Sequence, residues 1–220
     1  MREHFLRTLF DLVIPPRSTE RVVRTLTLED LQQLALQGSE RGGILPYHDE
    51  LVRALVWEVK YYANRHAAAL AGALLAEQLV AIAAEELGTP LLIPTPMHNA
   101  RRRERGHNQT ELVCEVALRE LAPKTGVLRA AYPTQQPLIQ YAPHALVRIR
   151  NTPQQQGLPK HIRKHNIRKS MQVVNEPLVR GRICVVFDDV TTTGATFAEA
   201  TRALRAAGAR RIICIALAQS

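Results

Sequence analysis

The chain of 220 residues contains 46% hydrophobic and 22% charged residues, which predicts a soluble, globular protein with one main domain and a small appendage. Its 29 lysines and arginines exceed its 20 acidic residues, so the formal net charge is +9. Such a surplus predicts an anionic partner, and charge alone leaves open whether this is nucleic acid, a membrane surface or a phosphorylated small molecule.

Three features argue against membrane insertion, secretion and a zinc site. No run approaches the roughly 20 apolar residues that span a bilayer, and the closest, residues 66–88, is predicted to be a core helix because glutamates interrupt it. Charged residues also interrupt the apolar stretch within residues 1–16, so we expect no signal peptide. The three cysteines lie far apart among apolar neighbours, which favours a reducing, cytoplasmic location.

Residues 1–45 are predicted to form a small N-terminal helical element, and residues 46–220 the main domain. In the first segment leucines recur at helical spacing, at Leu28, Leu31, Leu34 and Leu36. From residue 49 to residue 88 the apolar spacing predicts two successive helices with a break near Asn64.

The middle of the main domain is predicted to contain a strand, a loop and a helix in succession. Residues 90–96, PLLIPTP, predict the strand, and the helix is expected over residues 108–122, with Asn108 at its N-cap and Glu111 three residues later. Residues 121–175 show no sustained period, which predicts one or two strands flanking a mobile loop.

The last part of the chain gives the clearest pattern. It predicts a strand over residues 182–190, a helix that begins near Gly194 and stops at Gly208, and a final strand over residues 210–219. Strands that alternate with helices predict an open, mostly parallel α/β sheet with helices on both faces.

The stretch VVFDDVTTTGATF, residues 185–197, places two acids, three threonines and a glycine after the predicted strand. Ligands of an open parallel sheet bind where a strand ends and the chain turns into a helix. The free N–H groups of the helix and the threonine hydroxyls suit a phosphate there, and Asp188 and Asp189 suit ribose hydroxyls or a hydrated Mg²⁺. The alternative is that the acids cap the helix and the threonines satisfy a loop.

CVVFDDVTTTGAT resembles the phosphoribosyl pyrophosphate signature of type I phosphoribosyltransferases. The resemblance implies a type I phosphoribosyltransferase-like fold. It also implies that Asp188 and Asp189 are catalytic residues that contact ribose and hold Mg²⁺ indirectly. The phosphate loop that it implies comprises Thr191, Thr192, Thr193, Gly194, Ala195 and Thr196.

Two basic stretches offer further anion-binding groups. In IPTPMHNARRRERGHNQTEL a Pro-x-Pro turn follows a predicted strand, and the arginines supply bidentate donors for pyrophosphate or another anion. The residues of this predicted anion loop are Thr95, Pro96, Arg101, Arg103 and Arg105. The alternative is a basic, solvated loop.

Residues 121–175 contain nine lysines and arginines and no acid, which accounts for the whole net charge. A basic flexible loop in this segment is predicted to lie over the phosphate turn. Its predicted anion-binding residues are Arg148, Arg150, Lys160, Arg163, Lys164 and Arg168.

Together these stretches resemble the ComF family of competence proteins, over about residues 45–220. The resemblance rests on P-x-P with R-x-R-G-x-N-Q, on R-x-T-x-x-Q-x-x-L closed by R-x-x-N, and on DDVTTTGAT; Lys60 and Tyr61 fit an earlier lysine and tyrosine position of the family. Members commonly carry an N-terminal zinc finger with cysteine ligands. This chain has Ser18 and Thr19 where a cysteine pair would be expected, so the short N-terminal element is predicted to lack the finger.

The resemblance implies a protein that binds phosphoribosyl pyrophosphate, or another ribose phosphate, with Mg²⁺. It further implies a role in competence, the uptake of DNA in natural transformation, through single-stranded DNA and with other competence proteins. Tyr61, Tyr62, Tyr132 and Tyr141 offer stacking surfaces for bases, or they are packing residues. Four histidines are predicted to face an anion rather than a metal, because nearby acidic or sulfur ligands are missing: His98, His107, His161 and His165.

The alternative function is an active phosphoribosyltransferase of nucleotide or nucleobase salvage. Positioning and charge stabilisation carry most of that reaction, so it needs little side-chain chemistry. The sequence offers no obvious acceptor pocket or general base. Whether the protein is an enzyme is therefore left open at this stage.

Overall fold

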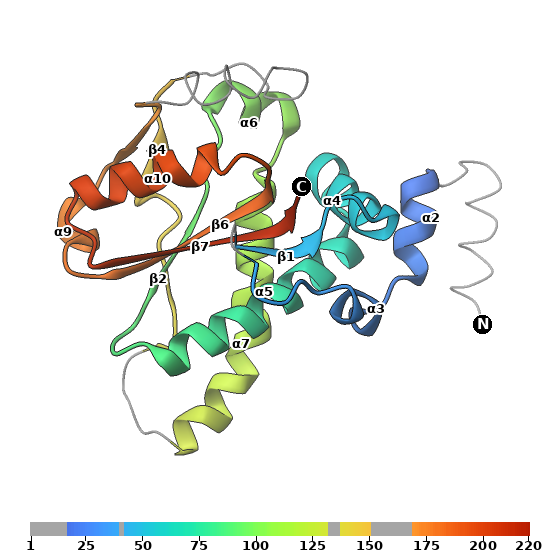
Figure 1. Ribbon diagram of the computed structural model, residues 1–220, viewed down its shortest axis with the longest axis horizontal. Coiled ribbons are helices and arrows are strands. Elements are labelled where there is room, and N and C mark those ends of the chain that lie inside the picture. Colours follow the sequence, from blue (N-terminus) through green and yellow to red (C-terminus); the bar gives the residue numbers. More distant parts are fainter. Residues whose placement is uncertain (1–16, 40–41, 132–136, 151–168) are drawn as a thin grey trace.

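The computed structural model of the protein describes residues 17–39, 42–131, 137–150 and 169–220, and its centre is a parallel sheet (Figure 1). Five strands lie side by side in the order β1, β7, β6, β2, β3. Every neighbouring pair is parallel. The bounds of these strands are Gly43–Pro46 (β1), Arg211–Gln219 (β7), Ile183–Thr191 (β6), Leu91–Pro94 (β2) and Gln140–Tyr141 (β3). This arrangement confirms the predicted open parallel sheet.

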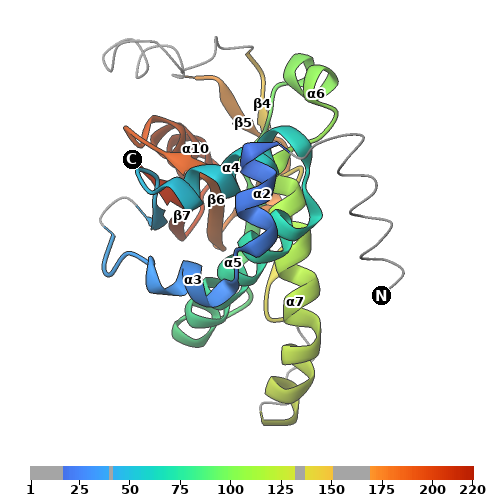
Figure 2. The ribbon, with the colours of Figure 1, turned by 90° about the vertical axis from the view of Figure 1, so that its right-hand side faces the viewer.

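Side chains alternate between the two faces of the sheet, as a strand period of two requires. Val185 and Phe187 of β6 belong to one buried cluster, whereas Cys184 and Val186 belong to the other. The first cluster is covered by α4, α5 and α7, and the second by α10 and a two-stranded antiparallel sheet of β4 and β5 (Figures 1 and 2). The bounds are Glu50–Tyr62 (α4), Arg65–Glu85 (α5), Gln109–Ala131 (α7), Ala195–Ala206 (α10), Leu146–Arg148 (β4) and Met171–Val173 (β5). Helices on both faces are thus confirmed.

The predicted break near Asn64 separates α4 from α5. Ala63 ends α4 in the left-handed conformation, and the Asn64 side chain accepts hydrogen bonds from the first N–H groups of α5. Among the described residues, α5 is the one helix long and apolar enough to cross a membrane, yet half of it is buried within the protein. Its Gly72 packs so closely on Val116 of α7 that a Cβ would collide. These contacts confirm α5 as the predicted core helix.

Three elements depart from the sequence prediction. Strand β1 lies in a stretch predicted to be helical or irregular, because four residues ending in proline are too few to display a strand period. Residues predicted as a loop form helix α6, Asn99–Arg105, which has no buried residue and therefore no apolar stripe. Helix α7 continues past Ala122 to Ala131. Pro123 and Gly126, which usually interrupt helices, lie in this extension and hid it from the sequence prediction.

The N-terminal segment docks on α4 through a buried carboxylate. Arg17 donates two hydrogen bonds to Glu58, whose side chain is fully buried, and Thr19 and Asn64 donate one each. Helices α2, Ser18–Thr25, and α3, Leu28–Gln33, contribute Val23, Leu26 and Leu31 to the cluster below the sheet. Strand β1 leads from this segment into the sheet and crosses the predicted domain boundary between residues 45 and 46. That boundary stays a prediction.

The segment predicted to hold one or two strands contributes three. Strand β3 lies at the edge of the main sheet, whereas β4 and β5 pair with each other over the second face, and α9, Glu176–Val179, follows them. Glu199 of α10 accepts a hydrogen bond from the N–H of Met171, and Arg202 donates one to the Met171 carbonyl. These bonds fix β5 to α10. The predicted mobile loop, residues 151–168, lies outside the described residues.

Candidate functional site

The turn between β6 and α10 lies at the carboxyl end of the sheet. The buried apolar run of β6 ends in Asp188 and Asp189, and Gly194, with a φ of 70°, is the N-cap of α10. Gly194 has no side chain with which to cap the helix, so the first N–H groups of α10 and the positive end of its dipole are suited to an anion. The Thr193 hydroxyl is buried and has no hydrogen-bond partner among the described residues.

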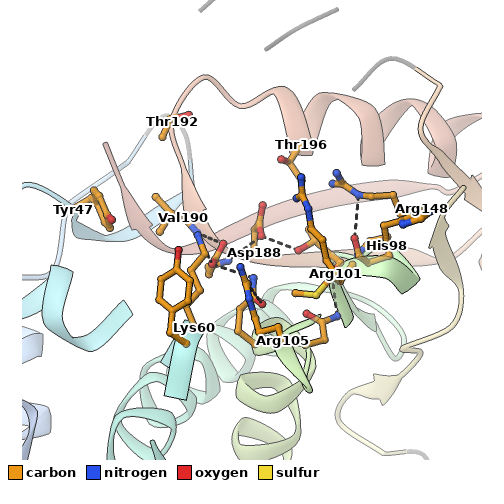
Figure 3. Close-up of a pocket in the computed structure, with 17 residues that line it drawn as sticks. Tyr47, Lys60, His98, Arg101, Arg105, Arg148, Asp188, Val190, Thr192 and Thr196 are labelled. Carbon is orange, nitrogen blue, oxygen red and sulfur yellow. Dashed lines mark hydrogen bonds and ion pairs between the residues drawn. The ribbon is translucent and has the colours of Figure 1, made fainter. Parts of the chain in front are cut away.

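A pocket of about 250 Å³ opens beside this turn (Figure 3). It collects side chains from four strand ends and four helices that are far apart in the sequence. The lining residues are Tyr47, Lys60, Tyr61, Thr95, Pro96, Met97, His98, Arg101, Arg105, Asn108, Gln109, Arg148, Asp188, Asp189, Val190, Thr192 and Thr196. Polar and charged groups predominate, as a phosphorylated ligand would require.

Asp188 is buried at the floor of the pocket. Its Oδ1 accepts hydrogen bonds from the Thr95 hydroxyl, at 2.8 Å, and from the N–H of Asp189, at 3.0 Å. Burial and the neighbouring charge of Asp189 raise the pKa of Asp188 to about 7, although these hydrogen bonds and the charge of Arg148 oppose the shift. This carboxyl therefore changes charge near neutral pH, where it is able to accept or release a proton.

Asp189 contacts a different set of groups. Gln109 donates a hydrogen bond to its Oδ2 at 3.1 Å, and Nζ of Lys60 lies 3.6 Å from the same oxygen. Its Oδ1 accepts a hydrogen bond of 2.8 Å from the N–H of Val190. Two consecutive carboxyl groups thus face one pocket while different neighbours hold each of them.

The acidic pair could hold a hydrated Mg²⁺ together with a bound ligand. Repulsion between the two carboxylates contributes to the raised pKa of Asp188, and a divalent cation would relieve it. The described part of the chain contains no group of three or more histidine, cysteine or carboxylate side chains placed to hold a metal. Oxygen atoms of a bound ligand and water would therefore have to complete the coordination.

Cations reach the pocket from α4, α6 and β4. Figure 3 shows Lys60, Arg101, Arg105 and Arg148 extending toward the acidic end of β6. Arg148 donates a hydrogen bond of 3.2 Å to the Pro96 carbonyl, and burial lowers its pKa, though an arginine stays charged. Arg105 donates one of 3.0 Å to Gln109, which in turn holds Asp189. The four cations could neutralise several phosphate oxygens.

The pocket brings together most of the residues predicted for it in the described part of the chain. These are Thr95, Pro96, Arg101, Arg105, Arg148, Asp188, Asp189, Thr192 and Thr196. Gly194 and Ala195 shape the turn at the start of α10 without lining the pocket. Their roles toward a ligand stay predictions.

Other predicted residues lie elsewhere. Arg103 is exposed on α6 and does not line the pocket. Arg150 is also exposed, and its Nε donates a hydrogen bond of 3.3 Å to the Lys169 carbonyl. Thr191 is buried in β6, where its carbonyl accepts a hydrogen bond from Ser220. Lys160, Arg163, Lys164 and Arg168, like His161 and His165, lie outside the described residues.

Several residues that line the pocket had no ligand-binding role in the predictions from sequence. Gln109 stands in a motif that the sequence displayed, and Lys60 belongs to a stretch that resembled the family. Tyr47 gave no signal, because it follows β1, the strand that the sequence did not reveal. These residues could be assigned only after the strand order was known.

Comparison with known proteins identifies a domain and a set of relatives. The phosphoribosyl transferase domain family matches residues 125–220. A DNA utilization protein YhgH from Salmonella typhi is 32% identical over 162 residues, which cover 72% of this chain and 63% of that protein. The protein of the same name from Escherichia coli strain K12 is 32% identical over 147 residues, covering 66% of this chain and 57% of that protein. The chain thus spans less than two thirds of either relative.

Solved structures give a more distant similarity. The glutamine phosphoribosylpyrophosphate (PRPP) amidotransferase from B. subtilis, complexed with ADP and GMP, is 18% identical, with a TM-score of 0.39. The match covers 74% of this chain and 30% of that one.

Proposed function

Because the chain carries a phosphoribosyl transferase domain, as its acidic motif predicted, and is a homologue of the DNA utilization proteins YhgH, we propose that its pocket binds phosphoribosyl pyrophosphate or a related ribose phosphate with Mg²⁺. The observation that carries this proposal is the position of Asp188 and Asp189. They follow the buried apolar run of β6, face four cations and lie beside the N-terminus of α10.

The ligand's groups match different parts of the pocket. The 5-phosphate belongs at the turn of residues 191–196, where the helix N–H groups and the threonine hydroxyls provide donors. The ribose hydroxyls belong beside the carboxylates of Asp188 and Asp189. Pyrophosphate, the most highly charged group, belongs near Arg101, Arg105 and Arg148, and bound Mg²⁺ would supply further neutralisation of its charge.

We further propose that the protein acts in DNA utilization, through single-stranded DNA taken up in competence. The name of the relatives and the surplus of positive charge support this role. Arg102, Arg103 and Arg150 place cationic groups on the exposed surface around the pocket. A cytoplasmic location, with free Cys114, Cys184 and Cys214, and contacts with other competence proteins belong to the same proposal.

Phosphoribosyl transfer is the second candidate, and the position of Asp188 at the floor of a cation-lined pocket favours it. In that reaction the bond from C1 of ribose to pyrophosphate breaks, while an acceptor nitrogen forms a new bond to C1 and loses a proton. A carboxylate of the pocket or water could take up this proton. Release of pyrophosphate on addition of a nucleobase would establish turnover, and its absence for all nucleobases would leave binding as the function.

Calorimetric titration with phosphoribosyl pyrophosphate, with and without Mg²⁺, tests the proposal. We expect Mg²⁺-dependent binding by the wild type and its loss in the double variant Asp188→Asn, Asp189→Asn. The control is Glu104→Gln, Glu120→Gln, which removes the same charge at two exposed positions outside the pocket. Binding by the Asp double variant equal to that of the control would contradict the proposed site.

The DNA role needs a separate measurement. Binding of a labelled single strand should weaken steeply as salt rises, because lysines and arginines that neutralise phosphates release counterions. Affinity undiminished at about 1 M salt would exclude the electrostatic mode of binding. The double variant Arg163→Ala, Lys164→Ala tests whether the predicted basic loop, which lies outside the described residues, contributes to binding of the strand.

A further inference from the structure

An aromatic pair on α4 extends from the pocket wall to the solvent. Trp57 and Tyr61 stand four residues apart, so they share one face of the helix. Their ring centroids are 4.4 Å apart and their planes are inclined by 47°. Tyr61 lines the pocket, whereas Trp57 lies outside it and is 43% exposed. The pair therefore presents a continuous aromatic surface that begins at the pocket.

Two cations of the pocket also lie against this surface. The guanidinium of Arg105 is 5.1 Å from the centre of the Tyr61 ring, and Nζ of Lys60 is 5.8 Å from it. Both distances are within the range of cation–π contact. The same two side chains reach Gln109 and Asp189 inside the pocket. Lys60 and Arg105, two cations able to bind phosphate, thus lie next to an exposed aromatic face.

We propose that Trp57 and Tyr61 form a stacking platform for a nucleobase of single-stranded DNA, with the adjoining phosphate against Arg105 and Lys60. Proteins that bind single strands combine cations along the backbone with aromatic rings on which bases stack. This inference rests on the proposed binding of single-stranded DNA. It specifies the place on the protein surface where a base would lie. The neighbouring Tyr62 differs, because Arg17 stacks on its ring at 3.6 Å and it does not line the pocket.

Intrinsic fluorescence tests the platform directly, because Trp57 is the only tryptophan of the chain. The full chain is titrated with a short 5′-phosphorylated oligothymidylate and with a strand of equal length that has the same phosphates and abasic sugars. The oligothymidylate should quench the emission in a saturable way and bind about tenfold more tightly than the abasic strand. Equal affinity of the two strands, or unchanged emission at saturation, would overturn the platform.

Variants separate stacking from charge and from folding. Trp57→Ala should lower the affinity for labelled oligothymidylate about tenfold, while Trp57→Phe should keep most of it, since phenylalanine also stacks. Tyr62→Ala is the matched control, because it removes an equally exposed ring next to the platform, and its affinity should stay within about twofold of the wild type. Equal affinities of Trp57→Ala and the wild type would overturn the inference.

The outcomes also distinguish this inference from the proposed function. Quenching by oligothymidylate without any binding of phosphoribosyl pyrophosphate would support the platform and contradict the ribose-phosphate pocket. Binding of phosphoribosyl pyrophosphate without quenching by the strand would support the pocket and overturn the platform. Absence of any strand binding to the wild type would overturn the platform together with the DNA role.

Discussion

The Thr95 hydroxyl donates a hydrogen bond of 2.8 Å to Oδ1 of Asp188, although 93 positions separate the two residues in the chain. Thr95 follows β2 and Asp188 lies in β6, and these strands are neighbours in the sheet. The bond is buried and connects the anion loop predicted from one motif to the acidic turn predicted from another. It therefore offers a way to change the chemistry of Asp188 without altering its side chain.

Thr95→Val should raise the pKa of Asp188 above its value of about 7, because the lost hydrogen bond favours the ionised carboxylate. The pH dependence of phosphoribosyl pyrophosphate and Mg²⁺ binding should then shift to higher pH, and stability should fall by about 1 kcal/mol. Thr201→Val is the control, since the Thr201 hydroxyl lies 3.8 Å from the Cys214 sulfur and Thr201 does not line the pocket. An unshifted pH profile for Thr95→Val would contradict this coupling.

Asp188→Asn should stabilise the protein at neutral and higher pH. The folded-state pKa of Asp188, about 7, lies above the ordinary value of 3.8, so the folded protein binds more protons between these values. The stability of the wild type should therefore fall as pH rises through this range. In urea unfolding at about pH 8 the variant should be more stable by at least about 1 kcal/mol, and the difference should shrink by about pH 5.

Asp30→Asn provides a control of opposite sign. Hydrogen bonds from the side chain and N–H of Thr27 lower the pKa of Asp30, so its ionised form stabilises the fold above the ordinary pKa. That stabilisation should be lost as pH falls through the lowered pKa, and the variant should be less stable than the wild type at about pH 8. The same sign for both variants would contradict the assigned environment of Asp188.

Arg101→Gln and Arg103→Gln should differ in their effect on ligand binding, although the sequence predicted the same anion-binding role for both arginines. Arg101 lines the pocket and Arg103 is exposed outside it, though both belong to α6. Loss of one charged donor to phosphate should weaken calorimetric binding of phosphoribosyl pyrophosphate about tenfold in Arg101→Gln. Arg103→Gln should stay within about twofold, and equal losses in both variants would indicate a general effect of charge.

Gly194→Ala should reduce both stability and ligand binding. Its φ of 70° is strained for alanine, while a Cβ would meet no atom within 4 Å, so the cost is conformational and about 1 kcal/mol. Gly181→Ala is a matched control, with a φ of 71° and the same free space around the Cβ, at an exposed turn outside the pocket. Thermal unfolding should shift equally in both variants. Only Gly194→Ala should weaken phosphoribosyl pyrophosphate binding, and unimpaired binding there would contradict a phosphate role for this turn.

The alternation of strands and helices could be predicted from the sequence wherever apolar spacing was long enough to show a period. It located β6, α10 and β7 closely, and the break at Asn64, because each has a buried apolar pattern bounded by a glycine or a capping residue. Strand β1 and helix α6 were not predicted, because neither shows a sustained apolar pattern. One is only four residues long, and the other buries none of its side chains.

The sequence by itself determined the acidic turn, since Asp188, Asp189 and the threonines are neighbours in the chain and their spacing fixes them at one strand end. Only the tertiary structure decided which distant groups complete the site. Gln109 reaches Asp189 across 80 positions because the parallel sheet sets β2 beside β6 and so brings the start of α7 to the same edge. Spacing along a chain specifies local periodicity, whereas the order of strands depends on how two apolar faces are buried at once, and that order brought Lys60 to the pocket. The turn of α6 placed Arg101 and Arg105, four residues apart, on the face that lines the pocket and left Arg103 outside it.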